Sequence, residues 1–161
     1  MMEKTFFNII RSPLKYRLYL LTKLPSAFFA GLKVAEADAD HAVVTIPYKW
    51  FTRNPFRSTY FAAQAMAAEM STGATALYLI ERTSARVSTL VTGLSARFTR
   101  KATQLATFTF ADGAAMRAAI DRAVATGEGV VFPARSVGRQ KDGTVVAEFE
   151  IEWSFKRRKD G

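Results

Sequence analysis

The sequence predicts an α+β fold in which an antiparallel sheet of about six strands wraps around one long, buried helix. Residues 58–80 carry a single formal charge, Glu69, and are rich in alanine, which is typical of a helix buried on most sides. On both sides of this stretch lie runs that are rich in β-branched and aromatic residues or that alternate apolar with polar residues, which is typical of strands. The last two runs are joined by Asp142-Gly143, a strong hairpin signal.

Residues 1–31 predict a helical extension. Leu14, Leu18 and Leu21 stand at i, i+4 and i+7, which predicts an amphipathic helix that starts near Ser12-Pro13. This helix packs on the body of the protein or, because basic residues surround its leucines, lies on a membrane surface. The sequence leaves both interpretations open.

Six strands are expected after the extension. They are residues 32–37, 41–48, 87–100, 105–111, 129–139 and 144–156. The first two form a hairpin, and a loop containing Asn54-Pro55 follows it. Ser58 or Thr59 is then expected to cap the long helix, which ends near residues 81–82. A short helix over residues 114–125 ends at Gly127.

Length and composition set further limits. A chain of 161 residues is the size of one domain, and its lack of cysteine excludes disulfides, thiolate metal sites and a cysteine nucleophile. No run reaches the length of a confident membrane span, and Lys23 and Pro25 interrupt the only plausible secretory signal. We therefore expect a cytoplasmic protein without stable membrane insertion.

The net charge of +9 raises the question of a polyanionic partner. The basic residues are scattered, no nucleic-acid recognition motif is present, and the one dense cluster is residues 156–159. That cluster is expected to be a solvated end, or a contact for polyphosphate or anionic lipid. We expect no nucleic-acid partner, whereas positive charge also suits the phosphates of coenzyme A.

Glu69 is the unusual residue of the long helix. Removing an ionised carboxylate from water without a partner is costly. Glu69 is therefore expected to be protonated, to pair with an arginine such as Arg97 or with a partner subunit, or to face a wet cleft where its chemistry is used. His41 is the only histidine, which gives little support to a catalytic triad or a histidine-dependent dehydratase, and no metal-ligand pattern is visible.

Two segments carry a resemblance to a known family. Residues 94–103, LSARFTRKAT, resemble the strand and turn that follow the helix in thioesterases of the phenylacetyl-CoA type, and residues 138–147, GRQKDGTVVA, resemble their last hairpin. Over residues 32–155 the chain resembles hot-dog-fold thioesterases and is most similar to the family called domain of unknown function 4442. The resemblance implies a helical extension at 1–31, a hot-dog domain at 32–156 and a basic tail at 157–161.

The resemblance also implies a site. In these thioesterases the loop before the helix carries an asparagine, a glycine-rich turn follows, and an acidic residue lies about two turns into the helix; Asn54, Phe61 and Glu69 fall at the corresponding spacings. A backbone N–H near Tyr60 or Phe61 would hold the thioester oxygen, and Glu69 would activate a water. Asn54 would steady that water or the carbonyl. The residues expected to bind substrate are Tyr60, Gln64, Arg97, Arg100 and Lys101.

The implied protein is an acyl-CoA or acyl-carrier-protein thioesterase. It needs no metal and no cofactor, and it is expected to form a homodimer or homotetramer. The family places small glycines where this chain has Tyr60 and Phe61. If these two rings fill the cleft, a non-catalytic protein that binds acyl or lipid-like ligands is the alternative. A basic module for nucleic acid or a membrane surface is a third, weaker hypothesis.

Overall fold

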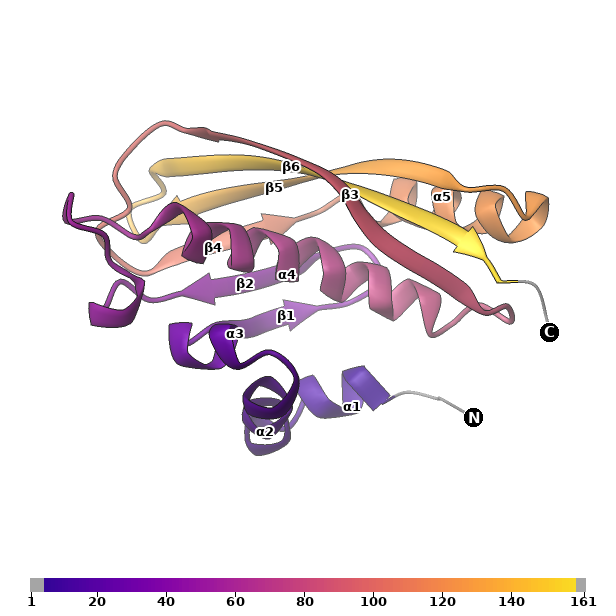
Figure 1. Cartoon of the computed structure of the whole chain (residues 1–161), viewed down its shortest axis with the longest axis horizontal. Helices are drawn as coiled ribbons and strands as arrows, with labels where there is room; N and C mark the ends of the chain where they lie inside the picture. Colours follow the sequence, from indigo (N-terminus) through magenta and orange to yellow (C-terminus); the bar gives the residue numbers. More distant parts are fainter. Residues whose placement is uncertain (1–4, 159–161) are drawn as a thin grey trace.

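The computed structural model describes residues 5–158, so Lys159 and the other outermost residues of the expected extension and tail lie outside the described part. The strands are β1 (Lys33–Ala37), β2 (Ala42–Ile46), β3 (Val87–Phe98), β4 (Ala106–Phe110), β5 (Val130–Gln140) and β6 (Val145–Arg157). They form one sheet in the order β1-β2-β4-β5-β6-β3, and every neighbouring pair is antiparallel. The predicted fold class is confirmed (Figure 1).

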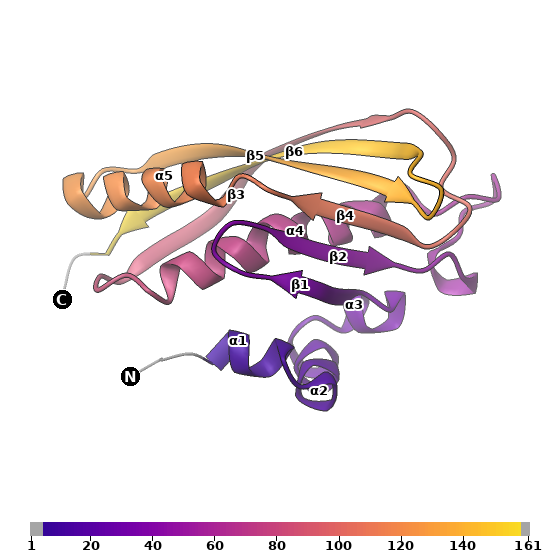
Figure 2. The same cartoon turned by 180° about the vertical axis from the view of Figure 1, so that it is seen from behind.

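The helices are α1 (Thr5–Ile10), α2 (Pro13–Lys23), α3 (Pro25–Ala30), α4 (Phe61–Ile80) and α5 (Gly113–Thr126), with a short 3-10 helix η1 (Trp50–Thr52). Helix α4 runs along one face of the sheet (Figures 1 and 2). Its buried alanines let it approach the large core side chains of the strands, such as Phe108 and Phe149. A buried 2.8 Å hydrogen bond between the hydroxyls of Ser71 and Ser136 also ties it to β5.

The start of α4 differs from the prediction that Ser58 or Thr59 caps it. The cap position is occupied by Tyr60, without a side-chain hydrogen bond to the helix. The Ser58 hydroxyl instead donates to Oδ1 of Asn54, and the Thr59 hydroxyl donates to the carbonyl of Ala102. Both hydroxyls are therefore used to hold the preceding loop and the β3–β4 connection, which leaves the first N–H groups of α4 without a side-chain cap.

Helix α5 ends at Gly127, as predicted, with the left-handed φ of 73° that a helix-terminating glycine adopts without strain. Its first residue, Gly113, lies against the turn between β1 and β2. The Gly113 N–H donates to the carbonyl of Asp40 at 2.9 Å, and a Cβ at this position would collide with the carbonyl oxygen of Ala39. This close approach of two backbones fixes α5 to the hairpin.

Strand β3 lies at an edge of the sheet and contains a bulge. Val91 is opposite Trp153 of β6 and Gly93 is opposite Glu152, so Thr92 is an extra residue without a partner. Beyond the bulge, Leu94 and Phe98 are opposite buried β6 residues and so face the same side of the sheet as α4. Each is nevertheless about half exposed, because β3 reaches beyond the cover of α4.

The first three helices lie beyond the β1 edge of the sheet (Figures 1 and 2). Helix α2 begins after Ser12, as predicted, and packs on the body through Tyr16 and Leu20. Leu14, Leu18 and Leu21, the leucine stripe of this helix, face away from the body and are exposed. Between residues 5 and 158, no helix combines the length and apolar character needed to cross a membrane.

Candidate functional site

Glu69 is partly buried and shares one side of α4 with Gly73, which lies against the ring of Trp153 in β6. The ion pairs found between residues 5 and 158 involve other carboxylates, and the Glu69 side chain accepts no hydrogen bond there. Its neighbours on this helix face include Ala65, Met66 and Gly73. Burial among such groups raises the pKa of Glu69 above its usual value.

Three residues that the sequence did not single out lie close to Glu69: Gly73, Trp153 and Tyr19. A Cβ built on Gly73 would stand 3.3 Å from the ring of Trp153 and 3.5 Å from Oε1 of Glu69, so this glycine leaves room for both groups. Tyr19 of α2 is also near: its pKa is raised by its own burial and then by the negative charge of Glu69. A lone glycine inside a long helix was the available signal.

The N-terminus of α4 supplies candidate hydrogen-bond donors. The Tyr60 N–H donates to the carbonyl of Thr52 at 2.7 Å, so it is occupied. The N–H groups of Phe61 and Ala62 have no backbone acceptor in the described part of the chain. Since the helix dipole places partial positive charge here, these amides can hold an oxygen that becomes negative. Of the two expected positions, Tyr60 and Phe61, only Phe61 keeps its amide available.

Asn54 organises the loop before α4. Its Oδ1 accepts hydrogen bonds from the N–H of Phe56 at 3.0 Å and from the N–H and hydroxyl of Ser58, both at 3.2 Å. The same loop contains Arg57 with a left-handed φ of 60°. These contacts use the oxygen of the Asn54 amide, and its Nδ2 is the group that remains able to donate to a ligand.

Gln64 lies one turn into α4 and is buried. Its Nε2 donates to the carbonyl of Thr59 at 3.0 Å, whereas its Oε1 is buried without a partner among the described residues. The rings of Tyr60 and Phe61 pack edge to face, 4.8 Å between centroids, and are about half exposed. In the single chain these rings stand at the surface.

Arg100 and Lys101 lie together, whereas Arg97 lies elsewhere. Arg100 and Lys101 line a wide depression of about 550 Å³ beside the β5–β6 turn, with Gln140 on the same wall. The Lys101 ammonium donates to the carbonyl of Phe56 at 3.1 Å, which joins this depression to the loop before α4. This arrangement is suited to bind a phosphate group.

Arg97 is directly opposite Glu148 in the sheet, on the face that α4 does not cover. Glu148 pairs there with Arg135 at 2.8 Å. Glu69 and Arg97 therefore lie on opposite faces of the sheet, so the chain's own Arg97 is not the partner of Glu69.

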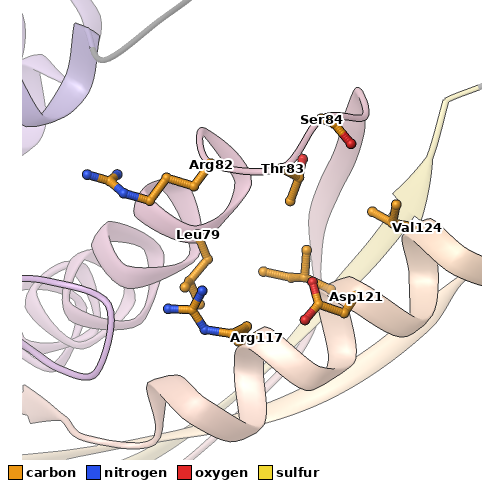
Figure 3. A pocket seen from close by; sticks show the side chains of 8 residues that line it. Leu79, Arg82, Thr83, Ser84, Arg117, Asp121 and Val124 are labelled. Atoms are coloured by element: carbon orange, nitrogen blue, oxygen red, sulfur yellow. The ribbon is translucent and has the colours of Figure 1, made fainter.

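A second hollow lies at the other end of α4 (Figure 3). It measures about 150 Å³ and is lined by the last turn of α4, the following turn and α5. Arg82, on its wall, stacks on the ring of Tyr78 at 3.4 Å and donates to the Tyr78 carbonyl, so its side chain is directed away from Thr83 and Ser84. None of the residues predicted for the site lies here.

His41 belongs to the β1–β2 turn and lies between two carboxylates, with Nε2 at 3.1 Å from Glu36 and Nδ1 at 3.1 Å from Asp38. From residue 5 to residue 158, no cluster of three or more His, Asp or Glu side chains is arranged to hold a metal ion.

Solved structures share this architecture. A protein of unknown function from Pseudomonas aeruginosa, PA5026, described as a probable thioesterase, superposes with a TM-score of 0.77 at 21% identity, over 91% of this chain and 97% of that one. The thioesterase HI1161 from Haemophilus influenzae gives 0.62 at 13% identity, covering 87% and 88%. The thioesterase SAV0944 from Staphylococcus aureus gives 0.63 at 14% identity, covering 81% and 97%. These similarities confirm the hot-dog, thioesterase-like fold.

No curated protein matches the chain. A family model described as domain of unknown function, DUF4442, matches residues 18–155, which is most of the sequence. The predicted relationship is thereby confirmed, and the chain belongs to the DUF4442 family.

Proposed function

We propose that this protein hydrolyses acyl thioesters of coenzyme A or acyl-carrier protein in the cytoplasm. The observation that carries the proposal is Glu69, a partly buried carboxylate with a raised pKa and no ion-pair partner among residues 5–158, on the helix whose first amides have no backbone acceptor in the same range. A pKa closer to neutral makes a carboxylate a better general base. The thioesterase-like fold supports the same class of reaction.

The proposed reaction needs one water and no cofactor. Glu69 takes a proton from the water as its oxygen attacks the thioester carbonyl carbon. The carbonyl oxygen, now negative, is held by the Phe61 N–H, assisted by the amide of Asn54 or Gln64. The C–S bond then breaks, and the leaving thiolate takes the proton back from Glu69, which yields a carboxylic acid and a free thiol.

One chain cannot supply both groups to one carbonyl. Phe61 and Glu69 are eight residues apart on the same helix, which corresponds to about 12 Å along its axis. A water held by Glu69 has to lie about 3 Å from the carbonyl carbon that it attacks. We therefore propose that Glu69 of one chain acts with the Phe61 amide of a second chain.

The free edge of β3 is the proposed site of that second chain. This strand is 12 residues long, its outer edge has no partner strand in the described part of the chain, and Leu94 and Phe98 are exposed on its α4 side. A long, apolar, unpaired edge favours pairing with another strand. Two copies joined here would continue the sheet across a two-fold axis and cover these side chains.

Arg100 and Lys101 are the proposed contacts for the coenzyme A phosphates. They line the depression that the Lys101–Phe56 hydrogen bond joins to the loop before α4. A polyphosphate bound there would leave its flexible thiol arm near the start of α4. The exposed rings of Tyr60 and Phe61 would then contact the arm or the acyl group. Arg97, on the opposite face of the sheet, has no part in this proposal.

The first test is hydrolysis of a panel of acyl-CoAs followed by detection of free thiol. We expect Glu69→Gln to lower kcat by about 100-fold or more while acyl-CoA binding persists, because only the general base is lost. The control is Glu128→Gln, an exposed residue beyond α5. Wild-type protein that binds acyl-CoA without turnover would contradict the proposal and favour the non-catalytic acyl-binding alternative.

A second test removes the amide itself. Phe61 is the first residue of α4, where proline is tolerated, and Tyr60 has the extended backbone, φ −59° and ψ 138°, that a residue before proline needs. Phe61→Pro should lower kcat by about 100-fold or more, since it deletes the donor. Phe61→Ala keeps the N–H and should retain most activity.

Mixing the two inactive variants tests the shared site. When Glu69→Gln and Phe61→Pro chains are unfolded and refolded together, a two-chain site restores about one quarter of wild-type activity, because half of the dimers are mixed and one of their two sites is intact. A site contained in one chain restores none. Absence of restored activity would therefore contradict the two-chain arrangement.

A further inference from the structure

Helix α2 has two apolar faces, and the structure uses only one. Tyr16 and Leu20 are 6% and 2% exposed and face the body. Leu14, Leu18 and Leu21 project from the opposite side and are 80%, 61% and 44% exposed. Three leucines on one exposed stripe of an 11-residue helix are unusual in a surface that only meets water.

The stripe is not an isolated feature. Four more large apolar side chains are exposed along α3, η1 and their approaches: Leu24, Phe29, Trp50 and Phe51. The ring of Phe29 lies 5.9 Å from that of Phe51, so α3 and η1 present adjoining aromatic surface. Helices α2 and α3 lie together beyond the β1 edge (Figures 1 and 2). We call these seven residues the leucine surface.

The segments that carry the leucine surface contain charge of one sign only. Residues 5–35 contain five basic residues and no Asp or Glu: Arg11, Lys15, Arg17, Lys23 and Lys33. Residues 42–60, which include η1, add Lys49, Arg53 and Arg57, again without a carboxylate. On α2 itself, Lys15 and Arg17 flank the stripe on either side. The surface therefore combines exposed apolar groups with an excess of positive charge in the segments that form it.

We propose that the leucine surface docks this protein onto an anionic lipid bilayer. Apolar side chains would enter the boundary between head groups and acyl chains, and the flanking basic side chains would meet lipid phosphates. Helix α2, at 11 residues, spans about 16 Å, roughly half the hydrocarbon thickness, so it lies in the membrane plane. The chain is thus a peripheral protein.

The charge pattern favours lipid over a second copy of this chain. A two-fold contact through the leucine surface would bring the same arginines and lysines of both chains together, with no carboxylate of this region to neutralise them. An anionic bilayer supplies the missing negative charge. This proposal does not depend on thioester hydrolysis, so either can fail while the other stands.

Binding is measured by flotation of the full chain with two kinds of vesicle. One is pure phosphatidylcholine and the other is equal parts phosphatidylcholine and phosphatidylglycerol. We expect strong flotation only with the anionic vesicles, falling as salt is raised. Trp50, which is 77% exposed, gives a second readout: its fluorescence should shift to the blue on binding, while Trp153 is already buried.

Matched variants separate this surface from the general positive charge of the protein. Leu14→Ser with Leu18→Ser should weaken binding to the anionic vesicles by at least about tenfold. The control, Leu90→Ser with Val131→Ser, changes two exposed apolar residues on the sheet and should leave binding unchanged. All four side chains are more than half exposed, so both variants are expected to fold.

Two further double variants test the role of the basic residues. Arg11→Gln with Lys15→Gln should weaken binding by about tenfold, whereas Arg117→Gln with Arg122→Gln, which removes the same charge from exposed positions of α5, should have a much smaller effect. Equal losses in both charge variants, or unchanged binding in the leucine variant, would overturn the proposal. So would a leucine variant that loses a dimer but keeps vesicle binding.

Discussion

The indole N–H of Trp153 on β6 donates a 2.9 Å hydrogen bond to the hydroxyl of Thr72 on α4, and this hydroxyl donates to the carbonyl of Glu69. Strand, helix and the candidate general base are thereby joined through two consecutive bonds. The Trp153 ring also lies against Gly73, so this one side chain contacts α4 at two positions next to Glu69 and fixes both the distance of the helix from β6 and its rotation.

Trp153→Phe is expected to lower the free energy of unfolding by about 1–3 kcal/mol, from the lost hydrogen bond and the space left by the smaller ring. Chemical denaturation measures this. Trp50→Phe is the matched control, because Trp50 is exposed and should change stability little. A Trp153 variant as stable as the wild type would show that the Thr72 contact does not hold the helix.

Gly113→Ala is expected to destabilise the fold by about 3 kcal/mol, since the new Cβ meets backbone that cannot rotate away, with the Cα of Asp40 at 2.5 Å. The comparison is Gly129→Ala, where nothing lies within 4 Å of the added carbon and the change should stay within about 0.5 kcal/mol. Similar melting temperatures for both variants would contradict the close approach of α5 to the β1–β2 turn.

Glu69→Gln should stabilise the folded protein at neutral pH. Burial raises the pKa of Glu69 in the folded state above its unfolded value near 4.5, so the native state loses stability as pH rises from that value through the folded pKa. The amide carries no charge and avoids this loss. Thermal melts between pH 4 and pH 8 should show a gain for the variant that vanishes toward the acid end. A gain that did not depend on pH would point to another cause.

His41→Gln should destabilise the protein at acid pH only. A hydrogen bond to Glu36, assisted by the negative charge of Asp38, raises the pKa of His41 above 6.5. The contribution of His41 to the free energy of unfolding is therefore complete below pH 6.5 and is lost as pH rises through the folded pKa. Because more than a third of the His41 side chain is exposed, solvent limits this loss of stability to less than about 1 kcal/mol, and added salt should reduce it further. Equal losses at pH 5.5 and pH 9 would contradict this assignment.

The order of elements could be predicted because local signals agreed with the final packing. The alternation of apolar and polar residues identified the strands, and the abundance of alanine with a single charge identified α4. Gly127 marked the end of α5, where the backbone has a positive φ. The start of α4 could not be predicted in the same way. Ser58 and Thr59 have capping side chains, yet tertiary partners, Asn54 and the Ala102 carbonyl, take their hydrogen bonds.

The leucine stripe shows a second limit. A period of 3.6 residues identifies an apolar face but not what covers it, and α2 has a second set, Tyr16 and Leu20, that meets the body. For the candidate site, sequence spacing located Glu69 and Phe61 on one helix. The spacing could not reveal that the Tyr60 N–H donates to the carbonyl of Thr52, or that Trp153 and Gly73 lie beside Glu69. These contacts depend on the tertiary structure.

The unpaired Thr92 makes one point of β3 tolerant of a change in length. Deleting Thr92 would bring Val91 and Gly93 into consecutive pairing with Trp153 and Glu152, and every side chain on both halves of the strand would keep its present face. Loss of a residue more than one position away from Thr92 would instead turn part of the strand over and exchange its inner and outer side chains. Natural relatives whose β3 is shorter by one residue should therefore have their gap at this position.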